Sequence, residues 1–369
     1  MKCWPFLLFA VITSAPAGAQ RIHATDKTAW NPAPTKGYSL QRAAYFGFTP
    51  PQQALMRANM AKVMEQLHQT PVLHPPRGYA ANLYATLCEY DCEGSKLLTG
   101  ESTIVFLQYT RKPNSTVVER APEGPSLHVW FNSISRIVSN IGLEKDAFFE
   151  EPYVTDTRQG FSVYGPFVAI TRGAEPLFVP ITREQYLKAE IKQAKERVEG
   201  IRKTAAEGSP YQQWLKTKEE AIKGALEGFA WAAKIDPAKA KADKEKFLKG
   251  MQQQESMYKA SEAGYLKEQQ GMIDKATNEW NHLQEELASL TPTQKAAPVT
   301  GPGGRTYVQA NPRYFNTSLP ASSVQLLVID LYKYGQGHHL YNTFSDADKY
   351  LFSTLQETVD LKALQALLQ

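Results

Sequence analysis

The sequence predicts an α+β fold with a mostly antiparallel sheet and flanking helices, interrupted by a long antiparallel helical hairpin of the coiled-coil type. From Thr182 to Leu290 the chain is dense in Lys, Glu, Gln and Ala. Its apolar residues recur at the three- and four-residue spacing of helices that share a seam. On either side, β-branched and aromatic runs bounded by Gly and Pro are typical of strands. We therefore expect one sheet-containing head, built from residues before and after the hairpin.

Capping signals divide the hairpin into three predicted helices, at about 183–207, 210–235 and 237–290. Each helix start has a side-chain cap, and the second and third also have proline at the first helical position. The caps are Thr182 with Gln185, Ser209 with Gln212, and Asp236 before Pro237. The first two helices together match the third in length, so an antiparallel hairpin aligns the best heptads and places Phe229, Trp231 and Phe247 at its tip.

The head is predicted from shorter signals. A Thr49 cap followed by prolines begins a helix that ends near His68. Strands are expected at Thr103–Tyr109, Leu127–Ile134, Phe161–Ile170, Leu177–Ile181 and Val324–Leu331. Gly165-Pro166 predicts a bulge or an edge position because proline cannot donate to a ladder. A short helix is expected over Leu143–Glu151, and Ser345 with Asp348 caps a last amphipathic helix.

The first 19 residues are typical of a secretory signal. A basic start precedes an apolar run from Cys3 to Ile12, and small residues at 17–19 precede Gln20. The apolar run is too short to span a membrane. The predicted organisation is a signal peptide at 1–19, the first part of the head at 20–181, the helical hairpin arm at 182–290, a Pro/Gly linker at 291–304 and the second part of the head at 305–369. The expected location is periplasmic or secreted.

Two cysteines, Cys88 and Cys92, follow the predicted cleavage point. In an exported protein an even number of cysteines favours a disulfide. Their spacing lacks the two intervening residues of a thioredoxin-like redox motif. We therefore predict a structural disulfide between them.

The charge of the chain is nearly balanced, with 41 Lys and Arg against 37 Asp and Glu. Because the two signs are interspersed, they indicate a solvated surface and argue against a nucleic-acid groove. The sequence contains neither a phosphate-binding loop nor a Gly-x-Ser-x-Gly elbow nor a His-Glu-x-x-His pair. We therefore predict no cofactor and no nucleic-acid partner.

Several short runs resemble parts of uncharacterised exported bacterial proteins that have an α/β head and an inserted charged helical region. They are the segment Pro176–Leu187, which opens the first hairpin helix, Asn311–Phe315, Leu319-Pro320 and Gln325–Val328. The resemblance covers about the last half of the chain and implies a bacterial, exported protein. It implies no activity and no catalytic residues.

Catalytic residues are not defined by the sequence, and the candidates with the best chemistry are His338, His339 and Glu150. Adjacent histidines near Asp346 and Asp348 resemble a small metal site, but zinc needs three or four well-placed ligands, so no metal is predicted. A pair of carboxylates such as Glu150-Glu151 or Glu89 with Asp91 would suit sugar hydrolysis only at the right separation; surface carboxylates are the simpler interpretation.

The remaining histidines and aromatic residues have equally simple alternatives. His74 and His128 have no obvious partners, and a cysteine nucleophile beside His128 would be silenced by the disulfide. Aromatic residues could line a glycan- or peptide-binding groove, but near proline turns they commonly close a core. This set comprises Tyr307, Tyr314, Phe315, Tyr332, Tyr334 and Tyr341.

Two hypotheses follow. The first is an exported envelope protein that acts by binding, with the helical arm recruiting a protein partner through Phe229 and Trp231 at its tip. The second is a secreted hydrolase that acts on cell-wall, glycan or peptide material through residues on the head loops. Neither hypothesis sets the oligomeric state, because the arm can pair within one chain or between two.

Overall fold

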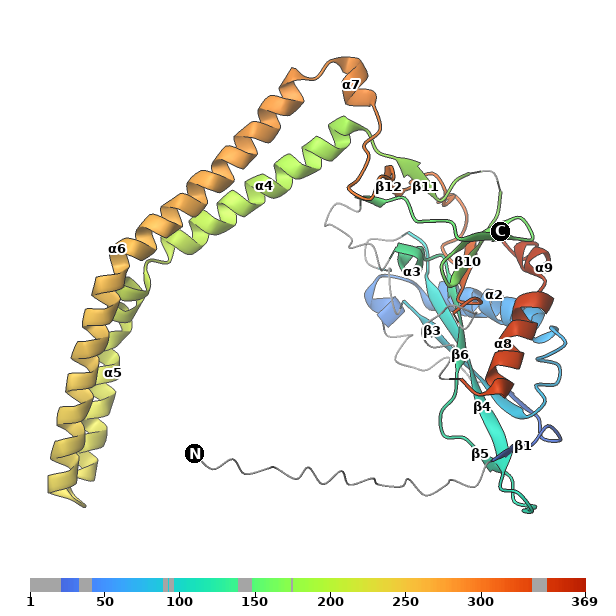
Figure 1. The fold of residues 1–369 in the computed structure, drawn as a ribbon, viewed down its shortest axis with the longest axis horizontal. Coiled ribbons are helices and arrows are strands. Elements are labelled where there is room, and N and C mark those ends of the chain that lie inside the picture. Colours follow the sequence, from blue (N-terminus) through green and yellow to red (C-terminus); the bar gives the residue numbers. More distant parts are fainter. Residues whose placement is uncertain are drawn as a thin grey trace, which may run out of the picture. The chain divides into compact units, whose positions relative to one another are not determined.

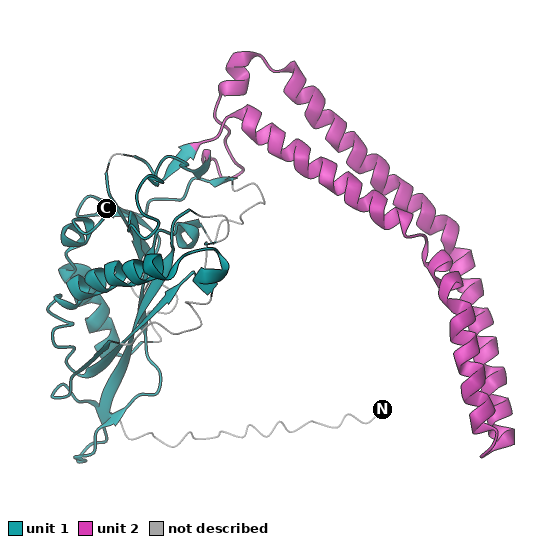
Figure 2. Cartoon of the chain, turned by 180° about the vertical axis from the view of Figure 1, so that it is seen from behind, with its two compact units in different colours: residues 1–179, 308–369 teal, residues 180–307 magenta. Residues whose placement is uncertain are grey.

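The computed structural model describes residues 21–32, 42–88, 92, 96–138, 148–173, 175–333 and 344–369. Contacts divide the chain into two compact units, shown in different colours in Figure 2. Unit 1 comprises residues 1–179 and 308–369, and unit 2 comprises residues 180–307. The predicted α+β fold with an inserted helical hairpin is confirmed.

Unit 1 contains a ten-stranded, mostly antiparallel sheet (Figure 1). Along its main path the strands are β2 (Ala29–Pro32), β3 (Tyr79–Leu87), β4 (Gly100–Arg111), β6 (Ser126–Phe131), β13 (Leu326–Ile329), β10 (Phe167–Thr171), β9 (Phe161–Tyr164) and β8 (Asp156–Arg158). Two short strands, β1 (Ile22–His23) and β5 (Glu119–Arg120), pair with the end of β4. β13 lies between β6 and β10, so a strand from the last part of the chain is central to the sheet.

Three helices cover one face of this sheet and form the main core. They are α2 (Pro50–His68), α8 (Asp346–Thr358) and α9 (Leu361–Gln365). Thr49 and Ser345 cap α2 and α8 with the predicted capping boxes. Alternate residues of the strands point into this core because successive side chains of a strand face opposite sides. From β4 and β6 these are Ile104, Phe106, Leu127, Val129 and Phe131.

The opposite face of the sheet carries a second, smaller core. Trp130, Leu326 and Val328 pack there with α3 (Ser135–Val138) and with three short strands. These strands form a separate sheet in the order β11 (Phe178–Pro180), β12 (Tyr307–Ala310) and β7 (Phe148–Glu150). Toward the first residues of β6 this face becomes polar, and the side chains of Ser126 and His128 lie there half-buried.

Some local predictions are wrong. Of the helix expected over Leu143–Glu151, residues 143–147 lie outside the described residues; the described part, Phe148–Glu150, is extended as β7, and Phe149 stacks edge-on against Phe178 at 5.4 Å. Gly165-Pro166 is neither a bulge nor an edge but the turn between β9 and β10, with Gly165 at a positive φ of 59°. Two short strands that are not among those predicted, β1 and β2, lie at the start of unit 1.

Unit 2 is the helical hairpin with its base. Its helices are α4 (Arg183–Ala206), α5 (Pro210–Ala232) and α6 (Pro237–Ser289), close to the predicted bounds. α6 packs against both α4 and α5, so one long helix pairs with two shorter ones (Figure 1). The break falls at Gly208, whose φ of 93° suits glycine.

The hairpin has a regular antiparallel register. Arg183 pairs with Glu286 at 2.6 Å and Arg197 with Glu279 at 2.8 Å, which joins α4 to the last part of α6. Farther along, Trp214 lies 6.2 Å from Tyr258, and Lys218 pairs with Glu255 at 2.6 Å. The seam between the two sides is therefore continuous across the break at Gly208.

The base of the hairpin is closed by short backbone pairings. Thr182 forms an antiparallel bridge with Pro298, and the Arg183 amide donates to the Ala297 carbonyl at 2.8 Å. The segment predicted as a Pro/Gly linker contains a short helix, α7 (Pro292–Ala296), followed by these pairings. The two ends of the hairpin are thus joined where they enter and leave unit 2.

Candidate functional site

The tip of the hairpin exposes a small apolar cluster. Phe229 and Phe247, from α5 and α6, face each other at 5.8 Å across the seam. Next to them in sequence, the side chains of Trp231 and Ile235 are 65% and 71% exposed. Scattered exposed apolar residues are ordinary on a protein surface. Two large exposed residues, one at the end of α5 and one in the turn that follows it, together with this half-buried aromatic pair make up what we call the tip cluster.

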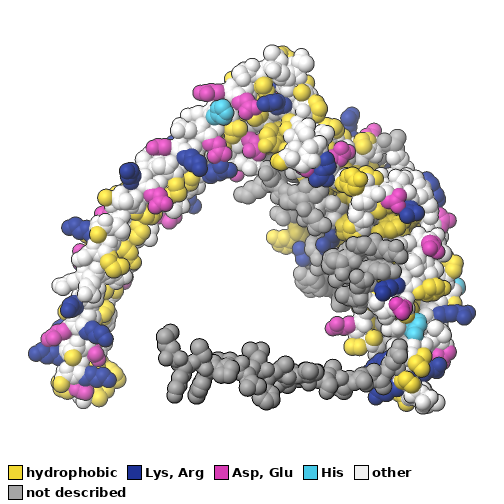
Figure 3. All heavy atoms as spheres, viewed as in Figure 1, with side chains coloured by type: hydrophobic (Ala, Val, Ile, Leu, Met, Phe, Trp, Pro, Cys, Tyr) yellow, Lys and Arg dark blue, Asp and Glu magenta, His cyan; other side chains and the backbone are white. Residues whose placement is uncertain are grey.

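The tip cluster is bordered by positive charge. From Lys234 to Lys249 the chain contains six lysines and three acidic residues, a net charge of 6 − 3 = +3. Figure 3 shows hydrophobic side chains interspersed with lysines at this end of the hairpin. Apolar anchors within a charged rim are typical of protein interfaces, where tryptophan often contributes much of the binding energy.

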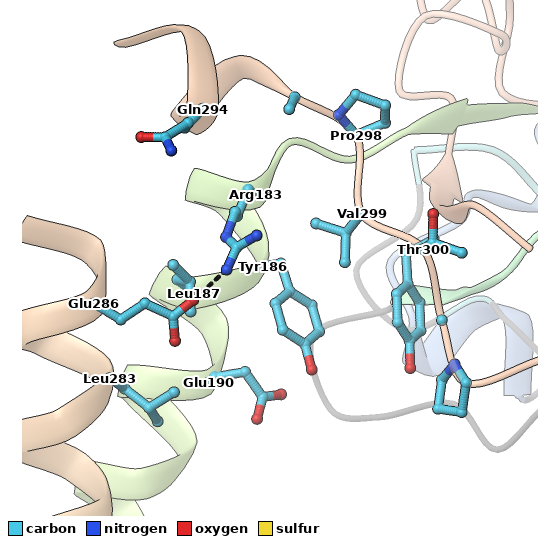
Figure 4. A pocket seen from close by; sticks show the side chains of 14 residues that line it. Arg183, Tyr186, Leu187, Glu190, Leu283, Glu286, Gln294, Pro298, Val299 and Thr300 are labelled. Carbon is cyan, nitrogen blue, oxygen red and sulfur yellow. Dashed lines mark hydrogen bonds and ion pairs between the residues drawn. The ribbon is translucent and has the colours of Figure 1, made fainter. Parts of the chain in front are cut away.

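A cavity of about 780 Å³ lies at the base of the hairpin (Figure 4). Tyr186 stacks on Tyr307 along one side, with ring centroids 5.4 Å apart. The Arg183 guanidinium, which also lines the cavity, is neutralised by Glu286. The remaining lining is largely apolar side chains and proline. Its polar lining also includes the side chains of Glu190, Gln294 and Thr300.

The predicted cysteine pair forms a disulfide. The sulfur atoms of Cys88 and Cys92 are 2.06 Å apart, and both residues are buried in the main core. Cysteine–His128 catalysis is therefore excluded in this state, because neither sulfur is a free thiolate.

The predicted catalytic residues are not brought together within the described part of the chain. Glu150 lies half-buried in β7. His338 and His339 fall outside the described residues, as do Glu89, Asp91, Tyr334 and Tyr341. Asp348 caps α8 through Ser345, and its other oxygen lies 3.4 Å from the hydroxyl of Tyr79. Among the described residues, no three His, Cys, Asp or Glu side chains gather as a metal site.

His74 and His128, which have no partners suggested by sequence, are both in contact with other side chains. His74 packs edge-on against His68, with ring centroids 4.8 Å apart. His128 lies between two polar partners from neighbouring positions of the sheet. Its Nδ1 is 2.7 Å from Glu101 Oε1, and its Nε2 is 2.7 Å from Ser126 Oγ. The hydrogen-bonded series of Ser126, His128 and Glu101 is not among the sites predicted from sequence.

Burial and contact with His128 shift the pKa values of two carboxyl groups in this cluster, those of Glu101 and Asp330. Burial disfavours the Glu101 carboxylate, but the hydrogen bond and charge of His128, together with Arg136, hold its pKa below the ordinary value. Asp330, directly after β13, accepts a 2.6 Å hydrogen bond from the backbone amide of His128. Burial raises the pKa of Asp330 to about 6 despite the opposing effects of His128 and Lys333.

The raised pKa of Asp330 predicts a pH-dependent stability. The folded state binds this proton more tightly than the unfolded chain, so stability falls as pH rises from about 4 to about 6 and then levels off. A shift of about two units corresponds to roughly 3 kcal/mol. Asp330→Asn keeps an acceptor for the His128 amide without the charge. We expect its stability relative to the unmodified protein to improve by up to that amount between pH 4 and pH 7.

Urea unfolding at several pH values, read by pulsed hydrogen exchange of β6 and β13, measures this difference within unit 1. The charged neighbours Glu101, His128, Arg136 and Lys333 are present in both proteins, so their titration largely cancels. If the difference in free energy of unfolding between the two proteins stays constant from pH 4 to pH 7, the pKa of Asp330 is not raised by folding.

The described helices are too short or too polar to cross a lipid bilayer. Comparison with known proteins identifies no relative: neither a family model, nor a curated protein, nor a solved structure matches this chain significantly.

Proposed function

We propose that this chain is an exported envelope protein that acts by binding, with the hairpin tip docking onto a partner protein. The observation that carries the proposal is the exposure of Trp231 and Ile235 beside the Phe229–Phe247 pair. A rigid tryptophan loses little conformational entropy when it enters an apolar pocket, which favours it as an anchor. The net charge of +3 around the tip favours an acidic rim on the partner.

The hairpin suits this role because its stability comes from its own seam. Ion pairs and aromatic contacts join α6 to α4 and α5 along their length, so the tip is held without using Trp231. Side chains at the tip can therefore be devoted to recognition. A partner that binds there gains a preorganised apolar surface.

The export part of the proposal rests on sequence and on the disulfide. The apolar run before Gln20 is typical of a secretory signal, and a disulfide persists best in an oxidising compartment. The proposed location is the periplasm or the exterior of the cell. A purified chain that begins at Gln20 is the expected product of signal cleavage, and mass spectrometry of its N-terminal peptide checks this.

Photo-crosslinking tests the tip. A benzophenone amino acid in place of Trp231 is expected to give one discrete protein adduct in cells, because the reactive ring replaces the proposed anchor. The matched control replaces Met257, which is 70% exposed on the same hairpin but lies away from the tip. Adduct formation at position 231 is expected to weaken several-fold above about 0.5 M salt, where charge is strongly screened.

Two results would contradict the proposal. One is equal crosslinking from positions 231 and 257, which would indicate collision rather than recognition. The other is crosslinking of position 231 to lipid alone, which would indicate a membrane surface as the partner. An adduct with a second copy of this chain would show that the tip binds another copy rather than a different protein. Light scattering of the purified chain would then detect the same self-association independently.

A further inference from the structure

We propose that Ser126, His128 and Glu101 form a nucleophilic active site that hydrolyses carboxylic esters. This activity lies in unit 1 and is independent of the binding function proposed for the hairpin. It differs from the hydrolase expected from sequence, because it uses neither Glu150 nor the adjacent histidines. Its basis is a continuous hydrogen-bond chain of nucleophile, base and acid with 2.7 Å at each step.

The partners of His128 determine its tautomer. An ionised carboxylate can only accept hydrogen bonds, so Glu101 requires the proton on Nδ1 of His128. The other ring nitrogen, Nε2, then has a free lone pair and accepts the hydroxyl proton of Ser126. This is the protonation pattern in which histidine removes a proton from serine while a carboxylate stabilises the imidazolium that forms.

Strand register explains why these side chains meet. Ser126 and His128 are two residues apart on β6 and therefore share one face of the sheet. On β4, Thr103 lies opposite His128 and Glu101 lies opposite Trp130. Glu101 consequently sits diagonal to His128 on the same face. This diagonal is within reach of a long side chain.

The surroundings hold the histidine in one orientation. The Trp130 ring stacks parallel to the imidazole with centroids 5.4 Å apart and an interplanar angle of 6°. The Thr103 hydroxyl lies 3.1 Å from Nδ1, on the side of the ring that faces Glu101. The buried Asp330 fixes the backbone of the same residue through its amide. A base held by contacts on its ring and its backbone is preorganised for proton transfer.

All three side chains of the cluster are partly shielded from solvent. The acid Glu101 is the most enclosed, with its side chain 13% exposed, and the base His128 is 23% exposed. Ser126, the first residue of β6, is half-buried. None of the three is fully buried, so the cluster lies at the surface of unit 1.

The reaction proceeds in two balanced steps. Ser126 Oγ attacks the ester carbonyl and loses its proton to Nε2 of His128; that proton then passes to the departing alkoxide, which leaves as the alcohol. The acyl group stays on Ser126. Water then attacks the acyl carbonyl, gives a proton to Nε2, and releases the carboxylic acid as Ser126 Oγ recovers that proton. Esters are the expected class because their alkoxide leaves more readily than the amine of an amide.

A fluorophosphonate probe tests the site directly, because it phosphonylates serine, with loss of fluoride, only when a neighbouring base activates the hydroxyl. We expect peptide mapping to place the label on Ser126. Ser126→Ala should abolish the label. His128→Gln and Glu101→Gln should slow it at least about 100-fold, the usual contribution of a positioned base. Hydrolysis of p-nitrophenyl acetate should fall in parallel.

Ser353→Ala is the matched control, since Ser353 is exposed on α8 and its hydroxyl donates only to the backbone of its own helix. This variant should be labelled like the unmodified protein. Hydrogen exchange of β4 and β6 verifies that each variant is folded. Absence of label on Ser126 in the folded, unmodified chain would overturn the proposal and leave the cluster as a structural hydrogen-bond network. Labelling of Ser126 that is unchanged in folded His128→Gln would overturn the assigned base.

Discussion

Replacing Asn132 by alanine will lower the free energy of unfolding of unit 1 by about 4 kcal/mol, because several buried backbone groups lose their partner at once. The Asn132 amide donates to the carbonyls of Leu98 and Ser323 at 3.0 and 2.8 Å. The side-chain oxygen of Asn132 accepts a hydrogen bond from the backbone amide of Gln325 at 2.8 Å. These groups lie on two segments that are far apart in sequence, around Leu98 and around Ser323–Gln325, so the side chain joins them in a buried site. The backbone of Asn132 also has a positive φ of 56°, which alanine tolerates poorly.

Asn114→Ala separates these two causes. Asn114 has nearly the same backbone conformation, with a φ of 60°, but its side chain is exposed in a turn. It should cost about 1 kcal/mol, the backbone effect alone. Urea unfolding followed by pulsed hydrogen exchange of β6 and β13 measures both variants. Equal losses would show that the buried hydrogen bonds of Asn132 contribute nothing beyond its conformation.

Phe352→Ala will have an effect of similar size for a different reason. Phe352 on α8 is fully buried, and its ring meets Phe106 of β4 edge-on at 5.7 Å. Truncation removes this contact and leaves a cavity between the helix and the sheet. Large-to-alanine changes of a buried phenylalanine cost about 3–5 kcal/mol. The expected result is therefore a loss of about 4 kcal/mol, with α8 amides exchanging faster than those of the central strands.

Tyr350→Ala is the control for Phe352→Ala, since it shortens an exposed aromatic residue on the same helix. It should change stability by no more than about 0.5 kcal/mol, as surface substitutions do. A comparable loss in both variants would show that the cost does not come from the burial of Phe352, since alanine is the better helix former at both positions. The measurement is the midpoint of urea unfolding for the two proteins at the same pH.

Local signals were sufficient to predict the hairpin. Helix caps act within four residues, and the seam repeats every three or four, so Thr182, Ser209 and Asp236 mark the three starts correctly. The antiparallel pairing follows because the turn before Pro237 makes α4 and α5 together about as long as α6. Nothing in this part of the fold depends on residues distant in sequence except the closure of the hairpin itself.

Strands were harder to predict because their partners define them. β3 has a run of alanine with an asparagine, which carries little strand signal, yet all nine of its residues pair with β4. Its position between β2 and β4 decides its structure, in the way that tertiary context overrides propensity. β7 was missed for a related reason, since Phe149 is extended only because it packs against Phe178.

The His128 cluster could be predicted only in part. Ser126 and His128 are separated by one residue in a strand, which already places both side chains on one face. Glu101, however, lies 27 residues from His128, and its proximity depends on the register of β4 against β6. Asp330 is farther still, at 202 residues. Both positions require knowledge of the sheet order.

The closed base of the hairpin makes its reach adjustable. Because Thr182 and Pro298 are paired, the chain enters and leaves the hairpin at adjacent points, whatever lies between them. Seven residues added to each side would preserve the seam and carry Trp231 about 10 Å farther from that base. The length of the hairpin therefore sets how far Trp231 lies from its closed base.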